Sequence, residues 1–121
     1  MNFDVSGSEK EVLEYLWKNP QGMRSRDILA YFNENKNKDW KKQTLNTFLL
    51  RLTEKGLVTN EKIDKKRFYR AACNEAEYET KKAEKVLDTL YDGSVSKFVM
   101  ALSGGEKIDK KTAEEIRKLL K

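Results

Sequence analysis

The chain has 121 residues, of which 38% are hydrophobic and 37% charged, and its formal net charge at pH 7 is +5. This length fits one ordinary domain, or one small domain with a helical appendage, and the high charged fraction argues against a single large core. With one cysteine, no apolar run long enough for a bilayer and no signal-peptide pattern, we expect a cytoplasmic protein without a disulfide framework, a multi-cysteine metal site or a membrane partner.

Two short amphipathic helices are predicted before residue 40. Ser6 and Glu9 have the spacing of a capping box at the start of the first helix, and residues 19–22, which contain proline and glycine, end it. Ser25 is the expected cap of the second helix, and residues 33–39 form a polar turn after it. The expected buried positions are Val12, Leu13, Leu16 and Trp17 in the first helix and Ile28, Leu29 and Phe32 in the second.

The third predicted helix, residues 40–55, has two dissimilar faces. Its buried stripe consists of Leu45, Phe48, Leu49 and Leu52. Its outward positions are Gln43, Thr44, Thr47 and Arg51, with Lys41 and Lys42 at the entry. These amide, hydroxyl and cationic side chains can hydrogen-bond to base edges and phosphates, and no acid lies among them to repel phosphate. Leu50 also falls on the outward side, where either a thymine methyl group or the following hairpin could contact it.

A basic hairpin is predicted directly after this helix. Gly56 fits the position just past a helix end, and residues 57–63 and 67–71 form two short strands around a turn at residues 64–66. Three short helices followed by a hairpin make a winged helix-turn-helix, which reads DNA with its third helix. The hairpin cations that could each neutralise a phosphate are Lys65, Lys66 and Arg67, although a solvated surface turn is the alternative interpretation.

The charge distribution supports nucleic-acid binding by the first part of the chain. Residues 1–72 carry fifteen Lys and Arg against ten Asp and Glu, whereas residues 73–121 carry ten of each. The whole positive excess therefore lies where the reading helix and the hairpin are predicted. We expect a DNA-binding domain over residues 1–72.

Residues 73–121 are expected to form a helical dimerisation domain. The sequence predicts helices over residues 75–91, 94–102 and 110–120, the last one capped by Asp109. So small a unit buries little surface alone, and pairing with a second copy would complete its core. The residues expected at the dimer interface are Val86, Leu87, Leu90, Val95, Phe98, Val99, Leu102, Ile116, Leu119 and Leu120.

An enzyme is poorly supported by the sequence. The chain has no histidine, which removes the commonest general base and metal ligand. It also lacks a glycine-rich phosphate loop and paired cysteines. We expect no catalytic residue, no metal and no cofactor.

Several segments together resemble the penicillinase-repressor family, the BlaI/MecI-like winged-helix transcriptional repressors. The matching segments are SEKEVLEYLW, DWKKQTLNTFLLRLTEKGLV, RFYRA, LYDGSVSKFVMAL and EEIRKLL. The resemblance implies a mainly α fold with a small β-hairpin wing, in which a winged helix-turn-helix precedes a three-helix C-terminal dimerisation domain. It implies a homodimer that represses transcription by binding an inverted-repeat operator in double-stranded DNA. The positions that match the family's DNA-contacting residues are Lys42, Gln43, Thr44, Thr47 and Arg51, with the wing at Lys65, Lys66 and Arg67.

The chain departs from the family pattern at three places. Gln43 stands where family members often carry lysine, which implies a different operator preference or salt dependence. In the antibiotic-resistance repressors a sensor protease triggers cleavage at an Asn–Phe bond, but the matching pair here is Ala101–Leu102, so the identity of any regulatory protease is open. The copper-responsive CopY-type relatives carry paired C-terminal cysteines, whereas this chain has only Cys73, so that metal route is absent.

Two other functions compete with the repressor hypothesis. Winged helices also dock on proteins, so the chain could be an interaction adaptor without sequence-specific DNA binding, whose C-terminal helices pair with a different chain. A regulator that senses a small molecule between its two domains is the third hypothesis, and no residue pattern marks such a pocket.

Overall fold

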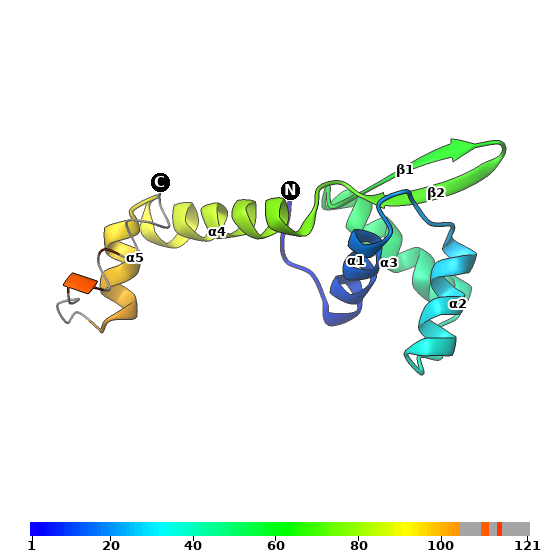
Figure 1. Ribbon diagram of the computed structural model, residues 1–121, viewed down its shortest axis with the longest axis horizontal. Helices are drawn as coiled ribbons and strands as arrows, with labels where there is room; N and C mark the ends of the chain where they lie inside the picture. The colour runs from blue at the N-terminus through cyan, green and yellow to red at the C-terminus, as the bar shows by residue number, and fades with distance from the viewer. Residues whose placement is uncertain (105–109, 112–113, 115–121) are drawn as a thin grey trace. The chain divides into compact units, whose positions relative to one another are not determined.

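The computed structural model describes residues 1–104, 110, 111 and 114. Over these residues, five helices and a two-stranded antiparallel sheet follow one another along the chain (Figure 1). Their bounds are α1 (Gly7–Lys18), α2 (Ser25–Asn35), α3 (Lys42–Glu54), β1 (Val58–Ile63), β2 (Lys66–Ala71), α4 (Glu75–Tyr91) and α5 (Val95–Leu102). The fold is mainly α with a hairpin wing, as the sequence predicted. The cap at Asp109 and most of the helix expected over residues 110–120 lie outside the described residues.

The Cα positions group into two compact units, residues 1–79 and 80–121. This division falls after the boundary expected at residue 72, because the first turn of α4 packs with the first unit. The Tyr78 side chain is fully buried, and its ring centroid lies 5.3 Å from that of Phe3 and 5.2 Å from that of Trp17. The division of the chain into a DNA-binding and a dimerisation domain stays a prediction.

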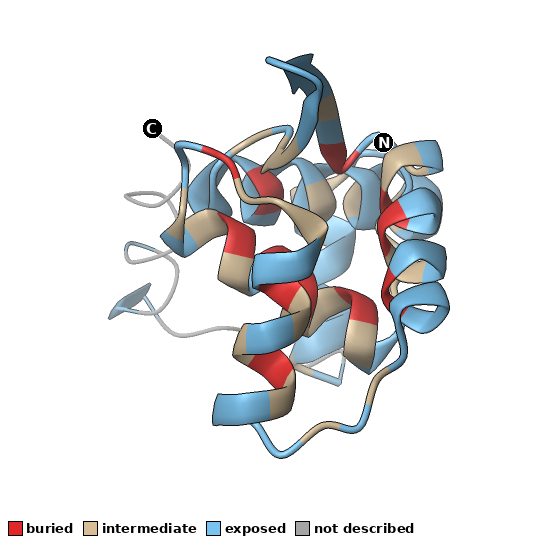
Figure 2. Ribbon diagram, turned by 90° about the vertical axis from the view of Figure 1, so that its right-hand side faces the viewer, coloured by how far each residue is buried: buried red, intermediate tan, exposed pale blue. Residues whose placement is uncertain are grey.

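The core of the first unit lies between the inner sides of its helices and the start of the hairpin. Buried and exposed residues alternate along each helix, as amphipathic sequences require (Figure 2). The buried hydrophobic residues are Val12, Leu13, Leu16, Ile28, Phe32, Leu45, Leu49, Leu52, Leu57, Val58 and Tyr78. Trp17, Trp40 and Phe48 are partly buried against this core. Burying one of the leucine, isoleucine, valine or phenylalanine side chains of this core completely contributes about 1.5–3 kcal/mol.

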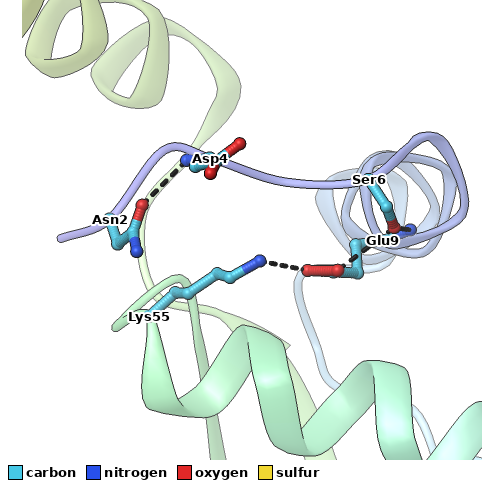
Figure 3. Close-up of polar contacts among 5 residues, drawn as sticks. All are labelled: Asn2, Asp4, Ser6, Glu9 and Lys55. Carbon is cyan, nitrogen blue, oxygen red and sulfur yellow. Dashed lines mark hydrogen bonds and ion pairs between the residues drawn. The ribbon is translucent and has the colours of Figure 1, made fainter.

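The predicted capping box at the start of α1 is confirmed and is part of a larger polar contact. The Ser6 hydroxyl accepts a hydrogen bond from the Glu9 backbone N–H at 3.1 Å and donates one to the Glu9 carboxylate at 3.1 Å. Glu9 is buried, and its carboxylate also accepts a hydrogen bond from the Lys55 ammonium (Figure 3). Burial opposes ionisation of Glu9, but the bonds from Lys55 and Ser6 outweigh it, so the pKa of Glu9 lies below its ordinary value.

Two details of α2 differ from the prediction. Ser25 is the first residue of the helix and not its cap; the N-cap is Arg24, which makes no side-chain capping bond to any described residue. The helix also runs on to Asn35, so part of the expected polar turn is helical. The side chain of Asn33 closes the remaining turn, because its amide donates to the Trp40 carbonyl and accepts from the Trp40 N–H, both at 3.0 Å.

The start and end of α3 set the position of its outward face. The helix begins at Lys42, so Trp40 and Lys41 precede it, and Lys41 is its N-cap. At the other end, Gly56 has a φ of +77°, and the Leu57 N–H bonds to the Leu52 carbonyl at 3.0 Å. This is a Schellman ending, which glycine permits because it tolerates a left-handed backbone. The predicted role of Gly56 is therefore confirmed.

The hairpin turn is shorter than predicted. The pairing runs from Val58 with Ala71 to Ile63 with Lys66, so Lys66 belongs to β2 and not to the turn. The two turn residues, Asp64 and Lys65, have φ values of +50° and +68°. A type I′ turn requires positive φ at both positions, and its twist matches that of the paired strands. The hairpin projects from the helices of the first unit (Figure 1).

In the second unit, α5 and the part of α4 after residue 79 lie where the sequence predicted helices, and no residue among 80–104 is buried. The break between α4 and α5 at Asp92 and Gly93 is confirmed by their positive φ values, and Ser94 caps α5 by accepting a hydrogen bond from the Lys97 N–H at 3.2 Å. Large hydrophobic side chains remain exposed here: Val86, Leu90, Phe98, Met100 and Leu102. Leu87, Val95 and Val99 are half-buried. Three residues expected at the dimer interface, Ile116, Leu119 and Leu120, lie outside the described residues.

Candidate nucleic-acid interface

The outward face of α3 is exposed along its whole length. The outward α3 positions predicted from the sequence are all exposed: Lys42, Gln43, Thr44, Thr47 and Arg51. Lys41, the residue before the helix, is exposed as well. The side chain of Leu50 is 59% exposed, so the hairpin does not cover it in the part of the chain that the structure describes. The core therefore takes one side of α3 and leaves the polar side free.

The polar groups on this face are partly organised by the helix itself. The Thr47 hydroxyl donates a hydrogen bond to the Gln43 backbone carbonyl at 3.0 Å, which fixes its rotamer and leaves its oxygen able to accept. The first turn of α3 contains no acidic residue. A helix start is electropositive, and with Lys41 and Lys42 beside it, this end of the helix favours an approaching anion.

A pair of backbone hydrogen bonds holds the hairpin against the start of α2. Met23 and Tyr69 exchange two bonds, of 2.9 and 2.8 Å, and so add a short third segment beside β2. The Arg70 guanidinium donates to the Gln21 carbonyl at 3.2 Å. Gly22, with a φ of +98°, lets these segments approach, because a Cβ there would lie 3.0 Å from Arg70 Nε.

This pairing creates a cleft of about 340 Å³ between the start of α2, the first turns of α3 and the end of the hairpin. It brings together Lys42 and the three hairpin cations, which the sequence had placed at the interface. The residues that line the cleft are Arg24, Ser25, Arg26, Leu29, Lys42, Leu45, Asn46, Lys65, Lys66 and Arg67. The remaining predicted positions on α3 lie outside this cleft.

Four polar residues of the cleft, Arg24, Ser25, Arg26 and Asn46, were not predicted at the interface from the sequence. Asn46 lies one helical turn after Lys42 and is exposed, so helical spacing could have identified it. Arg24 and Arg26 carried no such signal, because only the bonds between Met23 and Tyr69 place the start of α2 beside the hairpin. Their nearness to the reading helix is a property of the tertiary structure.

The described residues contain neither a cluster of metal ligands nor a helix that could span a membrane. No group of three or more His, Cys, Asp and Glu residues among them could hold a metal ion. None of the described helices is both long enough and apolar enough to cross a membrane. Cys73 is half-buried, and its backbone carbonyl accepts a hydrogen bond from the Trp17 indole at 3.0 Å.

A three-helix unit with a projecting hairpin and an exposed third helix is a winged helix-turn-helix, the fold of a DNA-binding transcription regulator. A family model described as penicillinase repressor matches residues 5–121, and the chain belongs to this family. The resemblance found in the sequence is thereby confirmed. Membership in a family of repressors identifies the protein as a transcription regulator.

Named relatives agree with this assignment at low identity. The chain is 23% identical over 116 residues to the penicillinase repressor of Bacillus licheniformis, covering 96% of this chain and 88% of the relative. It is 24% identical over 118 residues to the methicillin resistance regulatory protein MecI of Staphylococcus aureus strain N315, covering 98% and 94%. The penicillinase repressor of Staphylococcus aureus is 25% identical over 117 residues, covering 97% and 90%.

Proposed function

We propose that this protein is a sequence-specific transcriptional repressor that binds an inverted-repeat operator as a homodimer in the cytoplasm, with one α3 in each half-site. The observation that carries the proposal is the outward face of α3, which is exposed, acid-free before Glu54 and flanked by a basic hairpin. A helix fits the major groove, where amide and hydroxyl groups can distinguish base pairs. The names of the relatives, a penicillinase repressor and a methicillin resistance regulator, support the same conclusion. The proposal gives the protein no enzymatic role.

The exposed residues divide into two roles. Lys42, Gln43, Thr44 and Thr47 contact base edges or the phosphates next to them. Lys41 and Arg51, at the two ends of the face, and the hairpin cations Lys65, Lys66 and Arg67 hold the phosphate backbone and add affinity without sequence information. Leu50, on the same face, offers an apolar surface to a thymine methyl group.

Selection from a pool of random-sequence duplexes tests the sequence-specific part of the proposal. The full chain should enrich one inverted repeat, because two copies related by a two-fold axis read two identical half-sites. Thr47→Ala should weaken binding to the selected duplex about fivefold or more, since removing one base interaction costs about 1–3 kcal/mol, and it should leave binding to random duplex unchanged. The matched control is Thr80→Ala, an exposed threonine on α4, which should change neither.

Two results of that experiment would count against the proposal. Enrichment of no sequence would leave the protein-interaction adaptor as the better hypothesis. Equal weakening of specific and random binding by Thr47→Ala would remove the base-reading role of α3.

The homodimer is supported by the apolar surface of the second unit. Among the described residues 80–104, Leu90 and Leu102 are 67% and 73% exposed, which is unusual for leucines on amphipathic helices unless another surface covers them. The proposed contact residues that the structure describes are Val86, Leu87, Leu90, Val95, Phe98, Val99 and Leu102. Sedimentation equilibrium of the full chain should give twice the monomer mass of 14.2 kDa. A stable monomer would instead favour pairing with a different chain.

A further inference from the structure

We propose that the cleft between the start of α2 and the hairpin is a binding site for the phosphate backbone of DNA, in which Arg24 and Arg26 hold a strand beside the reading helix. This inference rests on the proposed function, because it assigns the strand to an operator half-site. It adds two residues at the start of α2 to the contacts made by α3 and the hairpin.

The charged residues that line the cleft are all cationic. Of its ten lining residues, all of which the structure describes, six are Arg or Lys and none is Asp or Glu. The uncharged lining residues are Ser25, Leu29, Leu45 and Asn46. Ser25 and Asn46 can add hydrogen bonds to a phosphate or sugar oxygen. Like charges held close together repel one another, so this arrangement favours an anionic occupant.

Five cations outside the cleft are paired with carboxylates, whereas only one of the six cleft cations has such a partner among the described residues. Lys10, Lys38 and Lys55 lie 3.6, 3.2 and 2.5 Å from the carboxylates of Glu79, Glu11 and Glu9. Arg70 and Lys97 are paired in the same way with Glu61 and Asp92. In the cleft, only Arg26 has a carboxylate partner among the described residues, Asp27, at 3.7 Å with both side chains largely exposed.

Arg24 is the most informative of these cations. It is half-buried, yet it has no ion pair with any described residue. Removing an arginine side chain even partly from water costs free energy unless an acceptor is found. The guanidinium fork matches the oxygens of a phosphodiester, and a duplex supplies such groups in a row.

The position of the cleft relative to α3 identifies the anion as a DNA strand. Lys42 and Asn46 line the cleft and also lie on the helix that carries Gln43 and Thr47 outward. A helix in the major groove has a phosphate backbone along each of its sides. A strand that follows the flank of α3 with its bases toward Gln43 therefore has its phosphates at the cleft.

The test compares two charge removals of equal size in the full chain. Arg24→Gln with Arg26→Gln removes two cations of the cleft, and Lys18→Gln with Lys36→Gln removes two exposed cations at the ends of α1 and α2 that do not line it. Affinity for random-sequence duplex is measured against salt concentration. For the cleft variant, the slope of log affinity against log salt should become shallower by about 0.9 for each phosphate that is no longer neutralised. The control slope should match that of the unchanged protein.

A second measurement locates the bound phosphates on the DNA. Single neutral methylphosphonate linkages are placed in turn along the selected duplex. At one or two adjacent linkages, neutralisation should weaken binding by the unchanged protein but have no further effect on the cleft variant, since that variant no longer binds the phosphate there. Arg26→Gln alone, at a side chain 73% exposed, keeps the test valid if the double variant does not fold.

Three outcomes decide between the proposals. A cleft-variant slope equal to the control slope, with the same set of sensitive linkages, overturns the phosphate site even if the protein selects an inverted repeat. Failure to select any sequence overturns the repressor proposal, while the slope on random duplex still tests the cleft. Restoration of the slope by Arg24→Lys with Arg26→Lys supports a charge interaction over a packing effect.

Discussion

The two units of this protein are built from helices of similar amphipathic pattern, yet they differ in how far their apolar side chains are buried. The first unit covers its apolar residues itself: eleven hydrophobic side chains of residues 1–79 are buried. The second unit, over its described residues 80–104, buries none and exposes Val86, Leu90, Phe98, Met100 and Leu102. Helical periodicity therefore identifies which face is apolar but not what covers it. In the first unit three helices and a hairpin cover it, and in the second we assign that role to another copy of the chain.

The largest expected effect lies in the core of the first unit. Leu16→Ala should lower the free energy of unfolding by about 2–5 kcal/mol, because it leaves a cavity at a fully buried site. Both tryptophans, Trp17 and Trp40, pack against this core, so indole fluorescence during urea unfolding reports on the first unit. Leu90→Ala, at a site 67% exposed, is the control and should leave that transition unchanged. Equal destabilisation by both changes would remove the contrast between the units.

The next effect comes from the buried carboxylate that joins α1 to the end of α3. Glu9→Gln should cost about 1–3 kcal/mol, since it removes a charge-assisted bond from Lys55 (Figure 3). The pKa of Glu9 is lowered in the folded state, so its contribution is present above the ordinary value of 4.5 and is lost as pH falls through the folded value. The difference between the two proteins should therefore shrink between pH 7 and pH 3. A difference that grew toward low pH would contradict the assigned direction.

Disrupting the apolar surface of the second unit should change assembly and not the first unit. Leu90→Lys places a charge in the proposed dimer interface and should weaken association by about fivefold or more, because a central apolar contact there contributes above 1 kcal/mol. The fluorescence transition of a protein kept monomeric should stay the same. Glu84→Gln, at an exposed position on the same helix, is the control in sedimentation equilibrium. An unchanged dimer constant for Leu90→Lys would place the interface elsewhere.

The smallest effects are expected when the serine that caps a helix is removed, once in each unit. Ser6 caps α1 and Ser94 caps α5, each by accepting a bond from the N–H three residues on. Ser6→Ala should lower the stability reported by fluorescence by about 1 kcal/mol. Ser94→Ala should reduce only the helicity measured by circular dichroism. An equal shift in fluorescence midpoint would show that the two units unfold together.

The sequence predicted the faces of α3 because a buried stripe at helical spacing leaves only one side for solvent. Every outward position chosen from that spacing is exposed, and the capping box at Ser6 and the helix end at Gly56 follow from local chemistry alone. The start of α2 was harder, since serine also suits the first turn of a helix, and the cap proved to be Arg24.

The cleft could not be predicted from local patterns. It depends on the two bonds between Met23 and Tyr69, residues far apart in the chain, which bring the start of α2 to the hairpin. The exact turn was also beyond the pattern, because Lys66 pairs with Ile63 and leaves only Asp64 and Lys65 between the strands, both at positive φ. Such features arise from register and tertiary pairing, which sequence spacing does not specify.

The most direct test of the central claim is the ratio of affinities of the full chain for the selected inverted repeat and for a scrambled duplex of the same composition. A base-reading α3 predicts a ratio of about a thousand or more at physiological salt. Gln43→Ala should lower the affinity for the repeat and leave that for the scrambled duplex as it was. Equal affinities for the two duplexes, with or without Gln43, would contradict the assignment of this face to sequence recognition.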